Sequence, residues 1–138
     1  MNAKVTWKGN LSFSGIAETG FTVPLGADVA VGGDDDGFRP IELFLVALAG
    51  CTSMDVISIL SKKRQPVSSF EVAVEAERST EHPRVFTHIT LEYIVKGRGV
   101  DRAAVERAVE LSTHKYCPAQ TMLSQVVPIK QIITIQED

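Results

Sequence analysis

The stretch Arg39-Pro40-Ile41-Glu42-Leu43-Phe44-Leu45-Val46-Ala47-Leu48-Ala49-Gly50-Cys51 decides the fold, because it opens the longest apolar run of the chain. Proline favours the first turn of a helix, where its missing N–H would have had no partner, and a glutamate suits the positive end of the helix dipole. Cations follow the run, where the dipole is negative, at Lys62, Lys63 and Arg64. The pattern predicts one long helix from Arg39-Pro40 to about Lys63, apolar on all sides and buried at the centre of the fold.

Polar residues interrupt this run at Glu42, Ser53, Asp55 and Ser58. A helix that spans a membrane needs about 20 consecutive residues that are predominantly apolar. We therefore expect a core helix and no membrane partner.

Short alternating segments precede the helix. Apolar and polar side chains alternate over residues 3–7, about 10–16 and 21–24, with turn residues between them, which predicts a small antiparallel meander. The segment from Gly26 to Gly37 combines glycines with three adjacent aspartates and predicts an exposed loop. It lacks the alternating ligands and bidentate glutamate of a calcium loop, so we assign it no metal.

The elements after the helix come in groups and do not alternate between strand and helix. They are two strands that form a hairpin, two helices and a last strand, expected at residues 68–77, 85–96, 101–114, 118–125 and 128–136. Such an order predicts an α+β fold. The length of 138 residues predicts a single domain over residues 1–138.

Composition excludes several classes of function. The net charge is −3 and the lysines and arginines are scattered, so the chain offers no basic surface to a nucleic acid. The first residues alternate and break at Gly9, which differs from the continuous apolar stretch of a secretory signal. We expect a cytoplasmic protein without nucleic-acid partners.

The two cysteines stand in unlike settings. Cys51 lies deep inside the apolar run, whereas Cys117 directly precedes Pro118, which marks a helix start. A helix N-terminus stabilises a thiolate, so we expect the thiolate of Cys117 to be favoured. In a reducing cytoplasm, two cysteines indicate redox, catalytic or metal-binding groups more than a permanent disulfide.

Two segments resemble the OsmC/Ohr superfamily, the osmotically inducible protein C and organic hydroperoxide resistance proteins. One is Arg39-Pro40-Ile41-Glu42-Leu43-Phe44 followed by Ala47-Leu48-Ala49-Gly50-Cys51, and the other is His114-Lys115-Tyr116-Cys117-Pro118. The resemblance extends along nearly the whole chain. It implies an OsmC-like fold, with antiparallel sheets packed around a long central helix, and an intertwined homodimer.

The resemblance also implies a thiol peroxidase that reduces organic hydroperoxides in oxidative stress defence. Cys51 would attack the O–O bond, Cys117 would resolve the sulfenic acid as a disulfide, and a dithiol would be the reductant. This chemistry needs no cofactor, because a neighbouring thiol condenses reversibly with a sulfenic acid.

The sequence departs from the family at two positions. Residues 1–38 contain no arginine to serve as the family's N-terminal arginine, and their only fixed cations are Lys4 and Lys8. A lysine lacks the fork geometry of arginine and replaces it poorly. Ile41 follows Pro40 where the family has its catalytic glutamate, so Glu42 is the candidate for that role, with Arg39 as the candidate cation.

Helix geometry limits what Glu42 and Arg39 do for Cys51 of the same chain. Along a continuous helix Glu42 would lie about 13–14 Å from Cys51, on the opposite side, and Arg39 about 18 Å away. Either residue would therefore serve the thiol from a second subunit or across a broken helix. The alternative is that the two residues form a salt bridge and dipole partner at the helix start.

Other interpretations stay open at this point. Cys51 is also compatible with an inert core residue, since a free cysteine packs like a small apolar side chain. His114 raises a zinc hypothesis with the two cysteines, but three ligands without a fourth make a weak signature. His82 and His88 are expected at the surface of the hairpin. The alternative function is a stress protein without catalysis that binds a small apolar ligand or a partner.

Overall fold

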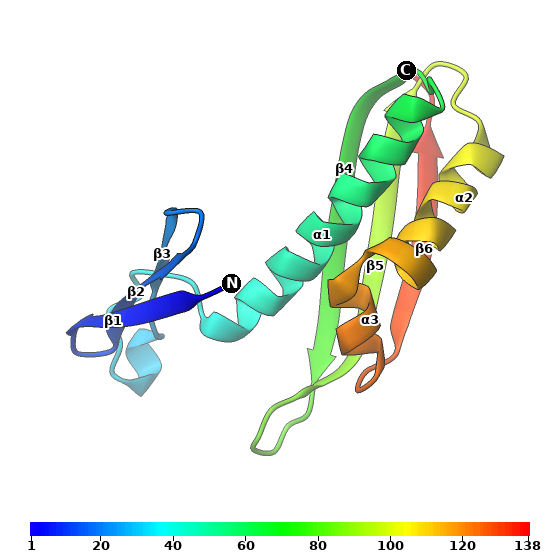
Figure 1. The fold of residues 1–138 in the computed structure, drawn as a ribbon. Helices are drawn as coiled ribbons and strands as arrows, with labels where there is room; N and C mark the ends of the chain where they lie inside the picture. The colour runs from blue at the N-terminus through cyan, green and yellow to red at the C-terminus, as the bar shows by residue number, and fades with distance from the viewer. The chain divides into compact units, whose positions relative to one another are not determined.

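Three strands open the chain in the computed structural model, which describes residues 1–138 (Figure 1). They are β1 (Ala3–Gly9), β2 (Ser12–Ala17) and β3 (Thr22–Leu25), paired in that order as an antiparallel meander. A loop with one 3₁₀ turn (Val29–Val31) leads to the long helix α1 (Pro40–Lys62). The predicted meander, loop and helix are confirmed within about two residues at each end.

The second sheet contains β4 (Val67–Arg78), β5 (Phe86–Gly97) and β6 (Ile129–Gln136). Between β5 and β6 lie α2 (Arg102–Leu111), a π-helical turn (Ser112–Tyr116) and α3 (Pro118–Ser124). The α+β class and the predicted hairpin are confirmed. The expected helix to His114 ends instead at Leu111, because the chain widens there into the π turn.

The sheets are not all antiparallel as expected, since β6 runs parallel to β5. A hairpin turn can only return the chain in the opposite direction, whereas a crossover connection carries it back to the same end of the sheet. Here α2, the π turn and α3 form that crossover. It brings Cys117 and α3 over the sheet before β6 begins.

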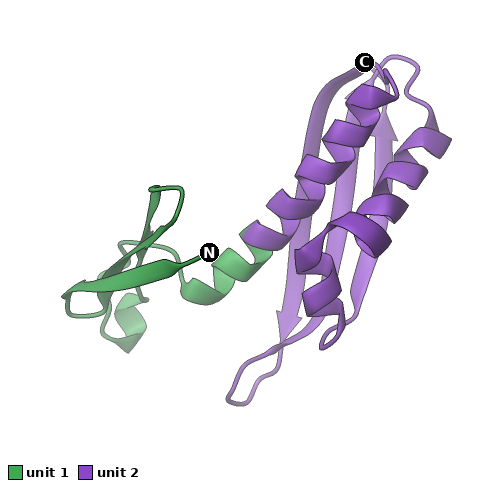
Figure 2. Cartoon of the chain, in the orientation of Figure 1, with its two compact units in different colours: residues 1–46 green, residues 47–138 purple.

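The chain divides into two compact units, Met1–Val46 and Ala47–Asp138 (Figure 2). Unit 1 holds the first sheet, the loop and the start of α1. Unit 2 holds the rest of α1, α2, α3 and the second sheet. All buried hydrophobic side chains lie in unit 2, between Leu48 and Val127.

The core of unit 2 forms between one face of the sheet and the helices that cover it (Figure 1). Strand β5 alternates strictly, and its inward side chains are at most 2% exposed: Ile89, Leu91, Tyr93 and Val95. Helix α2 contributes Ala104, Val105, Ala108 and Val109 from one face. Burial of this apolar surface stabilises the unit by about 25 cal/mol per Å².

Helix α1 is not buried on all sides, which corrects the expectation from its composition. A single stripe at every fourth residue is buried, namely Leu48, Thr52, Val56 and Leu60. Met54 is 73% exposed, and Phe44 and Val46 are also exposed. By length and composition the helix could cross a membrane, but in unit 2 its buried stripe packs in the α+β core.

Candidate active site

Cys51 and Thr52 are brought to the core of unit 2 by the buried stripe of α1. Thr52 occupies a stripe position and is fully buried, while Cys51, one residue earlier, is partly exposed. Neighbouring residues on a helix are about 100° apart, so only one of the two faces the sheet directly. Cys51 therefore lies at the edge of the core.

Cys117 is held in place by its backbone and by its sulfur. Its N–H donates to the carbonyl of Ser112, five residues earlier, at 2.9 Å, which closes the π turn. Its Sγ accepts a hydrogen bond from the backbone N–H of Gln120 at 3.4 Å, so Cys117 is the N-cap of α3. The predicted helix start at Pro118 is confirmed.

The two thiols are neighbours within unit 2, because Thr52, the residue after Cys51, contacts the same segment that holds Cys117. The Cys51 side chain is also one of the groups that raise the pKa of Cys117. Burial is the largest effect and raises the pKa of Cys117 from 9.0 to about 11, while the N–H groups of α3 lower it. The expectation of a favoured Cys117 thiolate is therefore wrong. Cys117 is only 1% exposed, so its thiolate would lose its hydration. This loss raises the pKa by more than the N–H groups at the start of α3 lower it.

A buried cluster of hydroxyl and amide groups lies beside the thiols. We call it the hydroxyl–amide cluster, and it consists of Thr52, Tyr93, Ser112, Gln120 and Gln131. The Tyr93 hydroxyl lies 2.9 Å from Thr52 Oγ1 and donates to Gln131 Oε1 at 2.7 Å. Gln120 Nε2 donates to Tyr93 Oη at 3.0 Å. Burial raises the pKa of Tyr93, which keeps its hydroxyl proton at neutral pH.

Sequence reasoning missed this cluster, although its members leave a signal. Thr52 interrupts an apolar stripe, and Tyr93 occupies an inward position of a buried strand. Buried polar groups are almost always hydrogen-bonded. Polar residues at core positions of two different elements are therefore expected to form a hydrogen bond with each other. The other members of the cluster leave no such signal in the sequence.

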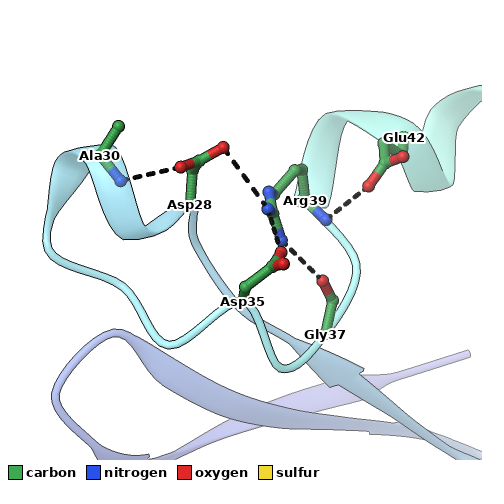
Figure 3. Close-up of polar contacts among 6 residues, drawn as sticks. All are labelled: Asp28, Ala30, Asp35, Gly37, Arg39 and Glu42. Carbon is green, nitrogen blue, oxygen red and sulfur yellow. Dashed lines mark hydrogen bonds and ion pairs between the residues drawn. The ribbon is translucent and has the colours of Figure 1, made fainter.

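Arg39 and Glu42 lie in unit 1, at the junction of the loop with α1 (Figure 3). Glu42 Oε1 accepts from the backbone N–H of Arg39 at 2.8 Å. The Arg39 guanidinium contacts Asp35 and Asp28 and donates to the carbonyl of Gly37 at 3.0 Å. The hydrogen bond to Asp35 raises the pKa of Arg39, so its charge is permanent.

The aspartate-rich loop is fastened through side chains within unit 1. Asn10 donates to the carbonyl of Gly32 at 2.7 Å, and Ser12 donates to Asp36 at 2.6 Å. Asp28 caps the 3₁₀ turn by accepting from the N–H of Ala30 (Figure 3). Together with Arg39, these contacts join the aspartates of the loop to the rest of unit 1.

Comparisons with known proteins agree with the fold and the cysteine segments. A family model described as OsmC-like protein matches residues 33–131. Protein YhfA of Escherichia coli K12 is 43% identical over 129 residues, which cover 94% of this chain and 93% of YhfA.

Two solved structures extend the comparison. A hypothetical protein from Aquifex aeolicus VF5 is 27% identical, with a TM-score of 0.87 over 99% of this chain and 96% of its own. An organic hydroperoxide resistance protein OsmC from Legionella pneumophila shares the fold, with a TM-score of 0.72 and 16% identity over 96% and 95% of the two chains. Since the family model spans most of the chain, including Cys51 and Cys117, this protein belongs to the OsmC-like family.

Proposed function

We propose that this protein is a cysteine-based peroxidase that reduces organic hydroperoxides. One observation carries the proposal: the fold of unit 2 brings the segments of the chain's two cysteines together through the hydrogen bonds of Thr52, although 65 residues separate the cysteines in the sequence. Membership of the OsmC-like family supports a peroxide-related stress role, as does the shared fold with an organic hydroperoxide resistance protein. Hydrogen peroxide is a second substrate to test.

The reaction uses the two thiols in sequence. The Cys51 thiolate attacks one peroxide oxygen, the O–O bond breaks, and an alcohol leaves with one proton from the medium, which gives the sulfenic acid of Cys51. The Cys117 sulfur then attacks the Cys51 sulfur, a disulfide forms, and water leaves with the proton of Cys117. A dithiol reductant restores both thiols and becomes a disulfide itself.

The exposure of the two sulfurs supports this assignment of roles. Cys51 is partly exposed, whereas Cys117 is 1% exposed and holds its proton at neutral pH. A peroxide therefore reaches Cys51 more easily, and a buried thiol is protected from oxidants until its partner has reacted. Arg39 and Glu42 remain proposed catalytic residues of a site that a second chain would complete, and their present contacts lie within unit 1.

We further propose a homodimer in the cytoplasm, without nucleic-acid or membrane partners. Unit 1 buries no apolar side chain, and residues of α1 such as Met54 expose large apolar groups. Exposed apolar surface of this kind marks a site of association. Exposed apolar side chains occur in both units, and we propose that a second copy of the chain packs against them.

Cysteine variants test the mechanism. Cys51→Ser should abolish consumption of an alkyl hydroperoxide, since the remaining Cys117 thiol is buried and keeps its proton at neutral pH. Cys117→Ser should allow one oxidation event and then overoxidise Cys51 to the sulfinic acid, because nothing traps the sulfenic acid. Peroxide loss and intact mass distinguish the two variants after one equivalent of oxidant, and a second equivalent tests overoxidation to the sulfinic acid.

The wild type should lose both thiols and two mass units of hydrogen. Equal loss of the first oxidation event in both variants would contradict the assigned roles. Thiols that survive excess oxidant would overturn the peroxidase altogether.

One observation favours the alternative of a ligand-binding stress protein without turnover. Residues 1–38 carry no arginine, and Arg39 is engaged by Asp35 and Asp28 in unit 1. Without a free guanidinium, the thiolate would lack its electrostatic support. Slow oxidation of both thiols, with tight binding of an apolar ligand, would favour this second function.

A further inference from the structure

The hydroxyl–amide cluster connects the helix that carries Cys51 to the segment that carries Cys117. Thr52, which follows Cys51 directly, lies 2.7 Å from Ser112 Oγ and accepts from Gln120 Nε2 at 3.3 Å. The backbones of Ser112 and Gln120 both contact Cys117, one at its N–H and the other at its sulfur. The same two residues therefore contact Cys117 through the main chain and Thr52 through the side chain.

Asp55 gives these hydrogen bonds a direction. Its Oδ2 lies 2.9 Å from Ser112 Oγ, and a carboxylate only accepts, so Ser112 donates to Asp55. The single hydroxyl proton of Ser112 is then committed, and Thr52 must donate to Ser112. Thr52 thus donates to Ser112 and accepts from Gln120, the two residues that contact Cys117 through their backbones.

The sheet fixes the other side of the cluster. Gln120 also donates to Tyr93 Oη at 3.0 Å, and its Oε1 accepts from Gln131 Nε2 at 2.7 Å. Gln120 is 1% exposed, and every buried polar side-chain atom has a hydrogen-bond partner. A fully satisfied buried network specifies one arrangement of the elements that it joins, because any shift leaves a partner unpaired.

We propose that Thr52 and Gln120 are positioning residues that hold Cys117 against Cys51 and thereby favour the Cys51–Cys117 disulfide. The inference rests on the proposed pairing of the two thiols and goes beyond it, since it assigns the geometry of the pair to residues that do not touch a substrate. Holding two reacting groups in place raises their effective concentration. Loss of the Thr52 hydroxyl removes the hydrogen bonds of Thr52 to Ser112 and Gln120, leaves only that of Ser112 to Asp55, and lowers that concentration.

The test measures the thiol–disulfide equilibrium against glutathione, which needs no peroxide. Glutathione disulfide oxidises the two protein thiols to one disulfide and is itself reduced to two molecules of glutathione. Thr52→Val keeps the shape of the side chain and removes its hydroxyl, and we expect the equilibrium constant for oxidation of the pair to fall about tenfold, which raises the reduction potential by about 30 mV. Thr52→Ser restores the hydroxyl and should return the constant toward the wild-type value.

Two further variants keep the test independent of folding defects. Thr121→Val makes the same chemical change on α3 at an exposed residue outside the cluster, and it should leave the equilibrium constant unchanged. Gln120→Met removes the amide from the other side and should reproduce the effect of Thr52→Val, which matters if Thr52→Val does not fold. Under hydroperoxide, both cluster variants should form more sulfinic acid at Cys51 for each disulfide formed.

The outcomes separate this inference from the proposed function. An equilibrium constant within twofold of the wild type in folded Thr52→Val and Gln120→Met would overturn the positioning role and leave the peroxidase standing. A tenfold fall in both variants, with Thr52→Ser restored, supports the positioning role even if the wild type consumes peroxide slowly. A wild-type protein that forms no Cys51–Cys117 disulfide in the glutathione buffer would overturn the inference.

Discussion

At the scale of single residues, Cys117 shows two opposing effects on one thiol. The α3 N-terminus favours the thiolate through the N–H of Gln120, and burial favours the thiol. Burial is the larger effect and the pKa rises to about 11. Position at a helix N-terminus therefore predicts an activated cysteine only where the sulfur also keeps contact with water.

The raised pKa predicts how Cys117 reacts with an alkylating reagent. In Cys51→Ser, burial still raises the pKa of Cys117, so iodoacetamide should modify Cys117 at least tenfold more slowly at pH 7 than it modifies a thiol of ordinary pKa. The rate should rise about tenfold per pH unit beyond the range in which an ordinary thiol titrates. Peptide mass spectrometry gives the rate, with the urea-unfolded protein as control, and a plateau below pH 9 would contradict the raised pKa.

The same pKa links stability to pH. Since the folded state binds the Cys117 proton more tightly than the unfolded chain does, the stabilisation is complete below about pH 9 and is lost as the pH rises toward 11. The free energy of unfolding of the wild type should therefore fall over this interval by more than that of Cys117→Ala. If the free energy of unfolding changed with pH in the same way in both proteins, the raised pKa of Cys117 would be contradicted.

At the scale of elements, the start of α1 has one half of a capping box, in which Glu42 reaches back to the N–H of Arg39. The Arg39 side chain meanwhile ties the preceding loop to the helix through Asp35 and the carbonyl of Gly37. The alternative considered from the sequence is confirmed in part: Glu42 binds the N-terminus of the helix, but Arg39 forms its salt bridges with Asp35 and Asp28 and none with Glu42. These contacts give both residues a structural role whether or not a second chain uses them in catalysis.

Substitutions at Glu42 separate the two roles. Glu42→Ala should lower the free energy of unfolding by about 1 kcal/mol, the usual cost of a lost cap. Glu42→Gln keeps the oxygen acceptor and should stay within about 0.5 kcal/mol of the wild type, because glutamine also serves in a capping box. Urea denaturation measures both.

Equal destabilisation by Glu42→Gln and Glu42→Ala would contradict the cap. A stable Glu42→Gln variant that no longer consumes peroxide would show that the reaction requires the negative charge of Glu42.

The elements also show what a sequence predicts well. Strand alternation, the Pro40 and Pro118 helix starts and the cysteine segments are local signals, and the structure confirms the elements that they predict. The parallel direction of β6 and the π turn depend on contacts between distant segments, such as the packing of α2 on the sheet, so local pattern misses them. The hydroxyl–amide cluster is missed for the same reason, since its five members come from five elements.

At the scale of the whole molecule, one chain covers only part of its apolar surface. In unit 1, Val5, Trp7 and Phe21 are exposed, and an apolar hollow of about 320 Å³ is lined by side chains such as Leu11 and Phe13. A three-stranded sheet needs a covered apolar face to be stable. The proposed second copy would supply that cover for unit 1 and for the exposed side of α1.

A charge placed on α1 tests the dimer. The wild type should sediment as a dimer, and Met54→Asp should shift it toward monomer or aggregate, because a carboxylate would be buried without a partner. Thr80→Glu adds a charge in the exposed β4–β5 connection and should leave the dimer intact. Sedimentation velocity at several concentrations measures the association, and a wild-type monomer throughout would overturn the proposed dimer.

The π turn at Ser112–Tyr116 also limits how this chain tolerates insertions and deletions. A π turn is an α-helix with one residue added, so removing a residue between Leu111 and Cys117 would restore the narrower helix and rotate the cysteine by about 100° away from α1. The connection from Ser79 to Val85 lies at the exposed end of a hairpin, where extra residues disturb little. Among relatives that keep both thiols, we expect the number of residues between Leu111 and Cys117 to stay constant while the hairpin connection varies in length.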